Sequence, residues 1–325
     1  MNKMKNEISI HQYTMTSSGS LNAKSARSAH CGALVRVNHE GVFGYGSLHP
    51  WPELGDESLD ESLAMLAEGH FTVLSSRTMQ CTRDDAAARG KGISLFQGLV
   101  VPRSHATLMM EAARFEAAVQ AGFTTVKVKV GRSTEMEARF IREQAKLYPD
   151  LMWRLDFNGS LDADAVESFL TELGEEVRDK IDFLEDAFLP GITPWINALG
   201  PYDIPMAVDR EVEDACGGYG VAVIKPALNE PMPILERILE DGKRAVITSY
   251  MDHPVGQSFA AWEAARAFHS FPDVVDTCGL ITHGLFEQDE FIAALGEPRP
   301  YFMPASGTGL GFDDLLESLS WTPLS

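Results

Sequence analysis

The stretch "TTVKVKVG", residues 124–131, alternates Val126, Val128 and Val130 with Lys127 and Lys129. Successive side chains of a strand point to opposite faces, so the two ammonium groups share one face and the valines share the other. A strand of a parallel sheet is covered on both faces and should be nearly all apolar. The lysine face therefore meets either water or the inside of a catalytic site.

Strand-like and helix-like segments alternate on both sides of this stretch. A strand is expected at residues 93–101, followed by a helix at 105–122. Further strands are expected at residues 151–158, 181–188, 204–211, 219–227 and 245–250. Alternation at this spacing is typical of parallel βα units, and seven or eight such units favour a closed TIM-type barrel, (β/α)7-8, in the α/β class.

The first part of the chain has a different pattern of expected strands and helices. Two strand-like runs, 30–38 and 40–48, read as a hairpin, and an amphipathic helix pattern follows them. The sequence therefore predicts an α+β capping domain at residues 1–95 and a barrel at residues 96–300.

An ionisable residue stands near the carboxyl end of five consecutive expected strands. They are Lys129, Asp156, Glu185, Asp209 and Lys225. The carboxyl ends of barrel strands converge on one face of the barrel, where active sites of this fold lie. One such residue would be an ordinary cap or salt bridge, but five in register indicate a functional constellation.

Three neighbouring carboxylates cannot all stay ionised without a cation between them. Hard oxygen ligands suit Mg²⁺, with Mn²⁺ as an alternative, and the absence of His or Cys from the set disfavours zinc, copper and iron. Asp156, Glu185 and Asp209 are thus the expected metal ligands. A lysine held near cations and partly dry has a lowered pKa and can act as a base, which suits Lys129 and Lys225 on either flank. On this reading Lys127 and Lys129 point into the barrel.

This pattern resembles the muconate-lactonising subgroup of the enolase superfamily, in which a KxK pair precedes three acids and a further lysine. The stretches "RLDFN", "IDFLED", "VAVIKPALN" and "AVITSYMDHPVG" are similar to the o-succinylbenzoate synthase family. The "GYGSLHPWPELGDES" stretch and the C-terminal "GTGLGF" resemble the same group. The resemblance covers most of the chain and implies an enolase-like fold, in which residues 301–325 return to the capping domain.

The resemblance also implies a reaction: Mg²⁺-dependent dehydration of 2-succinyl-6-hydroxy-2,4-cyclohexadiene-1-carboxylate, a small-molecule carboxylate of menaquinone biosynthesis. Lys129 would be the base and then the acid, and Lys225 would hold the opposite face of the enediolate. The substrate-binding residues implied are Lys127, Asn158, Thr248 and Gly279. Loops near residues 17–23 and 49–51 would close over the site.

The sequence departs from the family pattern in three places. Arg210 and Glu211 follow Asp209 where Glu usually follows directly, Asp186-Ala187 replaces Glu-Pro, and Asp252 stands where Glu is common. Three alternatives stay open: an N-acylamino acid racemase or dipeptide epimerase with the same site, a sugar-acid dehydratase, which the KxK strand disfavours, and a non-catalytic barrel that binds an anion.

Composition narrows the class of protein. The 325 residues are 45% hydrophobic and 23% charged, with a formal net charge of −20 that repels nucleic acid and anionic membranes. No apolar run approaches the ~18 residues of a membrane span, and no apolar stretch follows the first lysines as in a signal peptide. Four scattered cysteines without a CxxC pair fit a reducing compartment. We expect a cytoplasmic protein without nucleic-acid or membrane partners.

Overall fold

The computed structural model describes residues 7–19, 21, 28–188, 199–209, 212 and 218–325. Two sheets organise this part of the chain, one with four antiparallel strands and one with eight strands. Among the described residues, no helix combines the length and the apolar composition that crossing a membrane requires.

The smaller sheet belongs to the N-terminal domain. Its strand order is β12-β1-β2-β3, formed by β1 (Ile8–Thr16), β2 (Ala29–His39), β3 (Val42–Leu48) and β12 (Thr322–Pro323). The β2–β3 turn passes through Glu40 and Gly41, whose φ angles of 56° and 95° suit the tight turn of a two-residue hairpin. The hairpin expected at residues 30–48 is confirmed, since His39 pairs with Val42.

Two helices cover this sheet, α1 (Leu59–Ala67) and α2 (Val73–Arg89), after a 3-10 turn, η1 (Pro52–Leu54). Both begin with a capping box, in which Ser58 or Thr72 exchanges hydrogen bonds with the residue three positions on. Helix α2 packs directly on β3. A Cβ on Gly44 would stand 1.9 Å from the carbonyl oxygen of Thr82, so only glycine allows this close approach.

The larger sheet is parallel and has the order β10-β9-β8-β7-β6-β5-β4-β11. Its strands are β4 (Ser104–Leu108), β5 (Thr125–Lys129), β6 (Met152–Asp156), β7 (Ile181–Glu185), β8 (Met206–Val208), β9 (Val221–Ile224), β10 (Arg244–Ile247) and β11 (Cys278–Ile281). Parallel bridges from Ala245 to Val275 and from Thr248 to Gly279 join the two ends of the sheet and close it. The TIM-type barrel expected from the sequence is confirmed.

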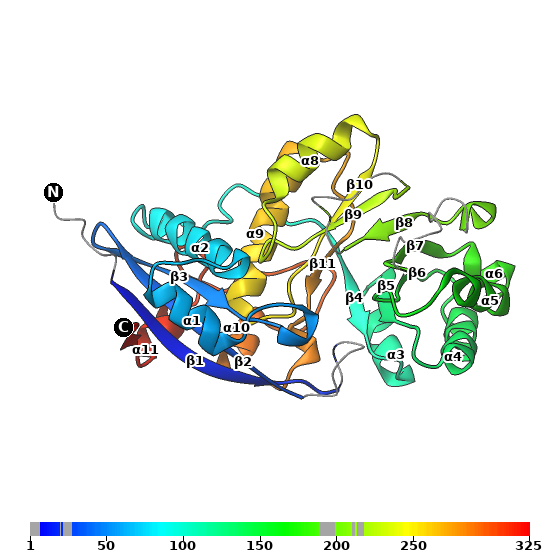
Figure 1. Cartoon of the computed structure of the whole chain (residues 1–325), viewed down its shortest axis with the longest axis horizontal. Coiled ribbons are helices and arrows are strands. Elements are labelled where there is room, and N and C mark those ends of the chain that lie inside the picture. Colours follow the sequence, from blue (N-terminus) through cyan, green and yellow to red (C-terminus); the bar gives the residue numbers. More distant parts are fainter. Residues whose placement is uncertain (1–6, 20, 22–27, 189–198, 210–211, 213–217) are drawn as a thin grey trace.

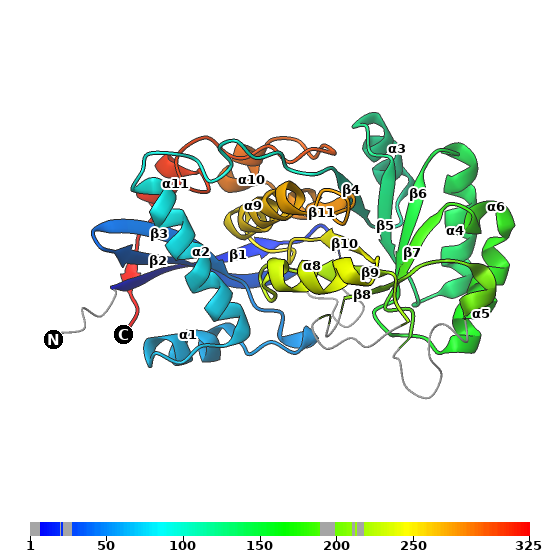
Figure 2. The same cartoon turned by 90° about the horizontal axis from the view of Figure 1, so that it is seen from above.

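Helices surround the barrel and connect it to the N-terminal domain. They are α3 (Ala112–Gln120), α4 (Thr134–Leu147), α5 (Ala163–Leu173), α6 (Glu175–Arg178), α8 (Pro231–Glu240), α9 (Pro254–Ser270), α10 (Glu290–Leu295) and α11 (Asp313–Ser318), with 3-10 turns η2 (Gly200–Tyr202) and η3 (His283–Leu285). Figures 1 and 2 show α3–α6 at one end of the molecule, the antiparallel sheet at the other end, and α9 between them.

The alternation in β5 separates two environments. Val126 and Val128 are fully buried in the core between the strands and the surrounding helices. Inside the barrel, below the ends of the strands, a separate apolar cluster of Phe183, Ala207, Val221, Val223 and Val246 fills the space. Charged side chains are thus confined to particular positions of the strands, and most of the barrel interior is packed.

The first barrel strand differs from the expectation. Residues 93–101 form turns with a single bridge from Ser94 to Gly309. The first barrel strand is β4, which overlaps the start of the segment expected to be a helix. The helix α3 begins only at Ala112. Leu95, Phe96, Leu99 and Val101 pack against the core without pairing into the sheet, whereas Ile93 and Val100 are exposed. The more polar "SHATL" is the segment that enters the sheet.

The C-terminal residues lie against the N-terminal domain. Ile10 of β1 pairs with Thr322 of β12, and the Arg89 guanidinium lies 2.5 Å from the Asp313 carboxylate. The domain limits at residues 95 and 300 stay an interpretation of the sequence.

Candidate active site

A cavity of about 420 Å³ lies at the carboxyl ends of the barrel strands. Seven of the nine predicted site residues line it: Lys127, Lys129, Asp156, Asn158, Asp209, Lys225 and Thr248. The other two adjoin it, since Glu185 contacts Lys127 and Gly279 pairs with Thr248. Leu54 of the N-terminal domain also lines the cavity, so both parts of the molecule enclose it.

Lys127 joins two of the predicted metal ligands. Its Nζ lies 2.5 Å from Glu185 Oε1 and 3.1 Å from Asp156 Oδ2. Burial would raise the pKa of Asp156, but Lys127 and Lys129 lower it to about 2. Burial and the charges of Asp156 and Asp209 raise the pKa of Glu185 to about 8, against the opposing effect of Lys127. Asn158 donates hydrogen bonds to Asp156 from its backbone and its side chain.

Lys225 stands opposite, bound to the third acid. Its Nζ lies 2.5 Å from Asp209 Oδ2 and 5.6 Å from the centre of the Tyr250 ring. Burial alone would lower the pKa of Lys225, but the Asp209 carboxylate raises it. The backbone N–H of Asp209 donates to Asp186 Oδ1 at 3.1 Å. Burial and the charge of Asp209 raise the pKa of Asp186 to about 7.

Lys129 has a different environment from the other two lysines. It is half-buried, and it forms no ion pair with any residue that the structure describes. Burial lowers its pKa, and the neighbouring charges of Lys127 and Lys225 lower it further against the attraction of Asp156. An amine whose pKa is lowered and which faces a cavity is better suited to accept a proton than an ordinary lysine.

The carboxylates of Asp156, Glu185 and Asp209 are not arranged around one common centre. Within the described part of the chain, no three acidic, histidine or cysteine side chains are arranged as a ready-made metal site, because lysines bind the carboxylates. The residues nevertheless fit a hard divalent cation. Asp209 Oδ1 is buried without a hydrogen-bond partner, and carboxylate oxygens are the ligands that Mg²⁺ prefers.

Sequence reasoning missed residues from β4 and from the loop after β10. His105, Thr107, Tyr250 and Met251 also line the cavity. The period-2 rule that placed Lys127 and Lys129 applies equally to His105 and Thr107, once residues 104–108 are recognised as a strand.

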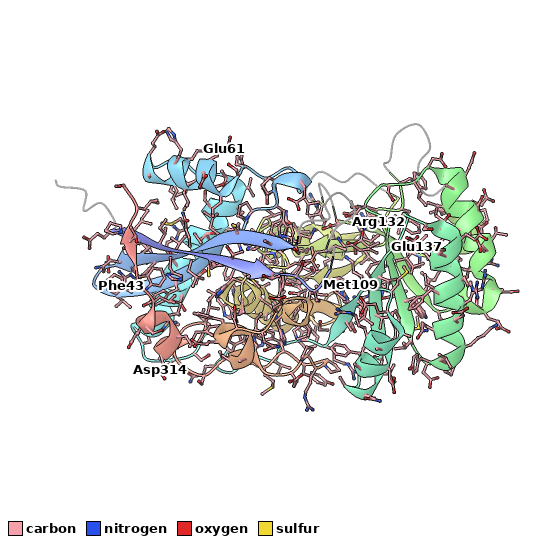
Figure 3. The ribbon with its side chains drawn as sticks, turned by 90° about the horizontal axis from the view of Figure 1, so that it is seen from below. Phe43, Glu61, Met109, Arg132, Glu137 and Asp314 are labelled. Carbon is pink, nitrogen blue, oxygen red and sulfur yellow. The ribbon has the colours of Figure 1, made fainter. Side chains whose placement is uncertain are left out.

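A second cavity of about 220 Å³ adjoins the first and shares Thr107, Lys129 and Met251 with it. Figure 3 shows Met109, which follows β4, on the same side of the barrel as Arg132 and Glu137, near the start of α4. Leu21, in the first of the two expected closing loops, also lines it. Residues 20, 22 and 23 of that loop lie outside the described residues.

The second expected loop packs on the barrel. Trp51 is 1% exposed, and its Nε1 donates to the carbonyl oxygen of Tyr250 at 2.9 Å. Of the departures from the family pattern, Arg210 and Glu211 lie outside the described residues, whereas Asp186 adjoins the cavity through Asp209 and Asp252 is buried in the loop before α9.

Comparisons with known proteins identify the family of this chain. Residues 8–88 match the family model described as "O-succinylbenzoate synthase, N-terminal domain". An o-succinylbenzoate synthase of Bdellovibrio bacteriovorus is 33% identical over 329 residues, covering 98% of both chains.

Solved structures share the fold. An N-succinyl Arg/Lys racemase from Bacillus cereus matches with a TM-score of 0.76 and 18% identity, covering 98% of both chains. A dipeptide epimerase from Enterococcus faecalis, complexed with Mg and the dipeptide L-Leu-L-Tyr, matches with a TM-score of 0.75 and 16% identity over 95% of this chain and 99% of that one. By its sequence similarity over 98% of its length, this chain belongs to the o-succinylbenzoate synthase family.

Proposed function

We propose that this protein is a lyase that removes water from 2-succinyl-6-hydroxy-2,4-cyclohexadiene-1-carboxylate to give 2-succinylbenzoate. The observation that carries the proposal is Lys129: a half-buried amine with a lowered pKa and no ion pair among the described residues, in a cavity lined also by two acids and two further lysines and adjoined by Glu185. Family membership supports the choice of substrate.

Lys129 performs both proton transfers. Its neutral amine takes the proton from the ring carbon that bears the carboxylate, and an enediolate forms. The bond from the ring to the hydroxyl oxygen then breaks, and the Lys129 ammonium returns the proton to the departing hydroxyl as water. The ring gains aromatic stabilisation. One group can serve both steps because proton and hydroxyl leave from the same face.

The other two lysines hold charge. Lys225 stays protonated beside Asp209 and offers a cation to the opposite face of the enediolate. The Asp156, Glu185 and Asp209 carboxylates outweigh burial and raise the pKa of Lys127, so it stays protonated as well. Its positive charge favours the neutral form of Lys129 and attracts the substrate carboxylate.

Asp156, Glu185 and Asp209 would hold Mg²⁺, which supplies Lewis-acid stabilisation of the enediolate charge when bound. Asn158 orients Asp156 through two hydrogen bonds. Thr248 and the backbone at Gly279 bind the succinyl side chain of the substrate. A cytoplasmic location and a place in menaquinone biosynthesis belong to the same proposal.

The test follows the absorbance change as the cyclohexadiene becomes aromatic, with and without added Mg²⁺. We expect product only when the metal is present. A purified, folded, Mg²⁺-loaded protein that forms no product would overturn the proposed reaction.

A racemase of N-acylated amino acids is the second candidate. It is favoured by the presence of two lysines in one cavity, which could act as base and acid from opposite faces. Incorporation of deuterium at the α-carbon of an N-succinyl amino acid in D₂O would support this activity, and its absence would exclude it for that substrate.

A further inference from the structure

The floor of the cavity contains a histidine that the proposed mechanism does not use. His105 is 2% exposed and lines the cavity. It precedes Thr107 by two positions on β4, and Thr107 pairs with Lys127 of β5. His105 therefore points into the barrel on the same face as Thr107.

Arg154 fixes the tautomer of this histidine. Its Nη1 lies 2.8 Å from His105 Nδ1 and donates its other proton to the carbonyl oxygen of Thr277 at 2.6 Å, while its Nε donates to Asp182 at 2.7 Å. A guanidinium only donates hydrogen bonds, so Nδ1 of His105 must accept. The imidazole is then neutral and its single proton resides on Nε2. Burial, together with the charges of Arg154 and Lys127, lowers the pKa of His105 well below its ordinary value, in agreement with a neutral ring.

Nε2 of His105 lies beside Gly279 and near Thr248. It makes no hydrogen bond with the described residues, and a Cβ on Gly279 would stand 2.9 Å from Nε2 and 3.0 Å from Thr248 Cβ. Glycine at position 279 therefore leaves room for the imidazole beside Thr248. These two residues are the ones proposed to bind the succinyl side chain.

We propose that His105 is a specificity-determining residue, whose Nε2–H, held in place by Arg154, donates a hydrogen bond to an oxygen of the succinyl side chain of the substrate. The inference rests on the proposed function, because it states which part of that substrate the cavity floor recognises. His105 cannot act as a base in this arrangement, because its only lone pair is bound to Arg154.

The test compares two ligands in two variants at saturating Mg²⁺. 2-Succinylbenzoate carries the side chain and benzoate does not. His105→Phe keeps a planar aromatic ring but removes the donor, and His105→Gln retains an N–H donor near the Nε2 position. His39→Phe is the matched control, since one ring nitrogen of His39 is also hydrogen-bonded, to the Thr82 hydroxyl, but His39 lies in the N-terminal domain away from the cavity.

Calorimetric titration should show 2-succinylbenzoate bound about 10- to 100-fold more weakly by His105→Phe, and within about threefold of wild type by His105→Gln and His39→Phe. Benzoate affinity should be unchanged in all of them. Equal binding of 2-succinylbenzoate by folded His105→Phe would overturn the inference, and so would an equal loss for both ligands, which marks a general disturbance of the cavity.

A second measurement does not depend on the folding of His105→Phe. Nitrogen-15 NMR of the wild type, with the His105 signals assigned by their loss in His105→Gln, should show Nε2 protonated and Nδ1 unprotonated. The Nε2 proton should shift when 2-succinylbenzoate binds and stay in place with benzoate. A proton on Nδ1 would overturn the inference.

The outcomes separate the two proposals. Wild-type protein that binds 2-succinylbenzoate through its side chain but does not form it would overturn the reaction and leave the binding role of His105 standing. Turnover of the diene with no effect of His105→Phe on substrate KM or product affinity would do the reverse.

Discussion

Two of the polar clusters among the described residues differ in charge. The lysine–carboxylate cluster comprises Lys127, Lys129, Asp156, Glu185, Asp209 and Lys225, at the ends of the barrel strands. The Tyr13 cluster lies where the N-terminal domain meets α9 and comprises Tyr13, His49, His253 and the nearby Asp252. The Tyr13 ring centre is 4.6 Å from that of His253 and 5.8 Å from that of His49.

Burial has opposite consequences in the two clusters. In the lysine–carboxylate cluster opposite charges compensate one another, so ionised groups persist beside a cavity and some pKa values rise while others fall. The four residues that define the Tyr13 cluster include no lysine or arginine. Burial therefore favours their neutral forms: it lowers the pKa of both histidines and raises that of Asp252. The first cluster is suited to proton transfer and the second to joining two domains.

The largest expected effect removes the amine that distinguishes the first cluster. Lys129→Ala should lower kcat by about 1,000-fold or more, as expected for a general base, while the midpoint of thermal unfolding stays the same or rises. Stability is expected to hold because the lost amine is half-buried and has no ion pair among the described residues.

Lys91→Ala is the control for this experiment, because Lys91 is exposed and distant from the cavity. It should leave both kcat and the unfolding midpoint unchanged. If Lys129→Ala retained a tenth of the wild-type kcat, the assignment of the base would be wrong, and the lowered pKa of Lys129 would be a consequence of burial alone.

The second prediction contrasts two carboxylates of one strand. Glu185 and Asp182 both lie on β7, but Asp182 pairs with Arg154 and Arg244 at the opposite end of the barrel. Glu185→Gln should weaken Mg²⁺ binding by at least about 100-fold and lower activity in parallel. Asp182→Asn should leave Mg²⁺ affinity unchanged and lower stability, because it leaves buried Arg154 short of a counter-charge.

Calorimetric titration of Mg²⁺ and urea unfolding of both variants give the two readouts. Wild-type Mg²⁺ affinity in Glu185→Gln would remove Glu185 from the proposed ligand set. A loss of Mg²⁺ affinity in Asp182→Asn would show that the two ends of the barrel are coupled.

The lysine–carboxylate cluster was accessible from sequence because its members obey a simple geometric rule. Its members lie in or at the end of apolar runs that are marked as strands, and most of the spacings along the chain match one βα unit. The rule predicts which residues lie near one another, but not which of them form ion pairs. It could not show that Lys127, rather than Lys129, binds Asp156 and Glu185, because that choice depends on the depth of each side chain in the barrel.

The first barrel strand was predicted wrongly for a related reason. Residues 93–101 are the more apolar segment, yet β4 is formed by the more polar residues 104–108. Inside the barrel His105 is stabilised by Arg154, which lies 49 positions further along the chain. A local pattern carries no information about such a partner. The same limitation hid the Tyr13 cluster, in which loop histidines, His49 and His253, are buried by packing between domains.

The third prediction concerns pH and the Tyr13 cluster. Burial lowers the pKa of His49 and His253 to about 3 each, from about 6.5 in the unfolded chain. Between these values the unfolded chain binds two protons that the folded chain does not, so stability falls as pH falls, by about 1.4 kcal/mol per pH unit for each histidine. Asp252 acts in the opposite sense, because burial raises its pKa to about 7 and the folded chain takes up its proton first.

Between about pH 6 and pH 4, the effect of Asp252 on the unfolding free energy therefore cancels the effect of one histidine. The unfolding free energy then falls by about 1.4 kcal/mol per pH unit as the pH is lowered. Relative to wild type, Asp252→Asn should steepen the pH dependence of the unfolding free energy by about that amount, and His49→Gln should flatten it by about that amount. Urea unfolding at several pH values in this range measures the slopes. Equal slopes in all three proteins would mean that these groups are not held neutral by the fold.

The smallest expected effect removes one hydroxyl from the domain joint. The Tyr13 hydroxyl lies 3.0 Å from His49 Nδ1 and 3.1 Å from Ser47 Oγ. Tyr13→Phe should cost about 1 kcal/mol of unfolding free energy, the usual net value of a buried hydrogen bond, and change kcat by less than about twofold. Lys129→Ala is expected to do the reverse, with a large loss of kcat and no loss of stability. If Tyr13→Phe lowered kcat by tenfold while remaining folded, the joint would be part of the catalytic apparatus, and neutral burial would not be a mark of a purely structural role.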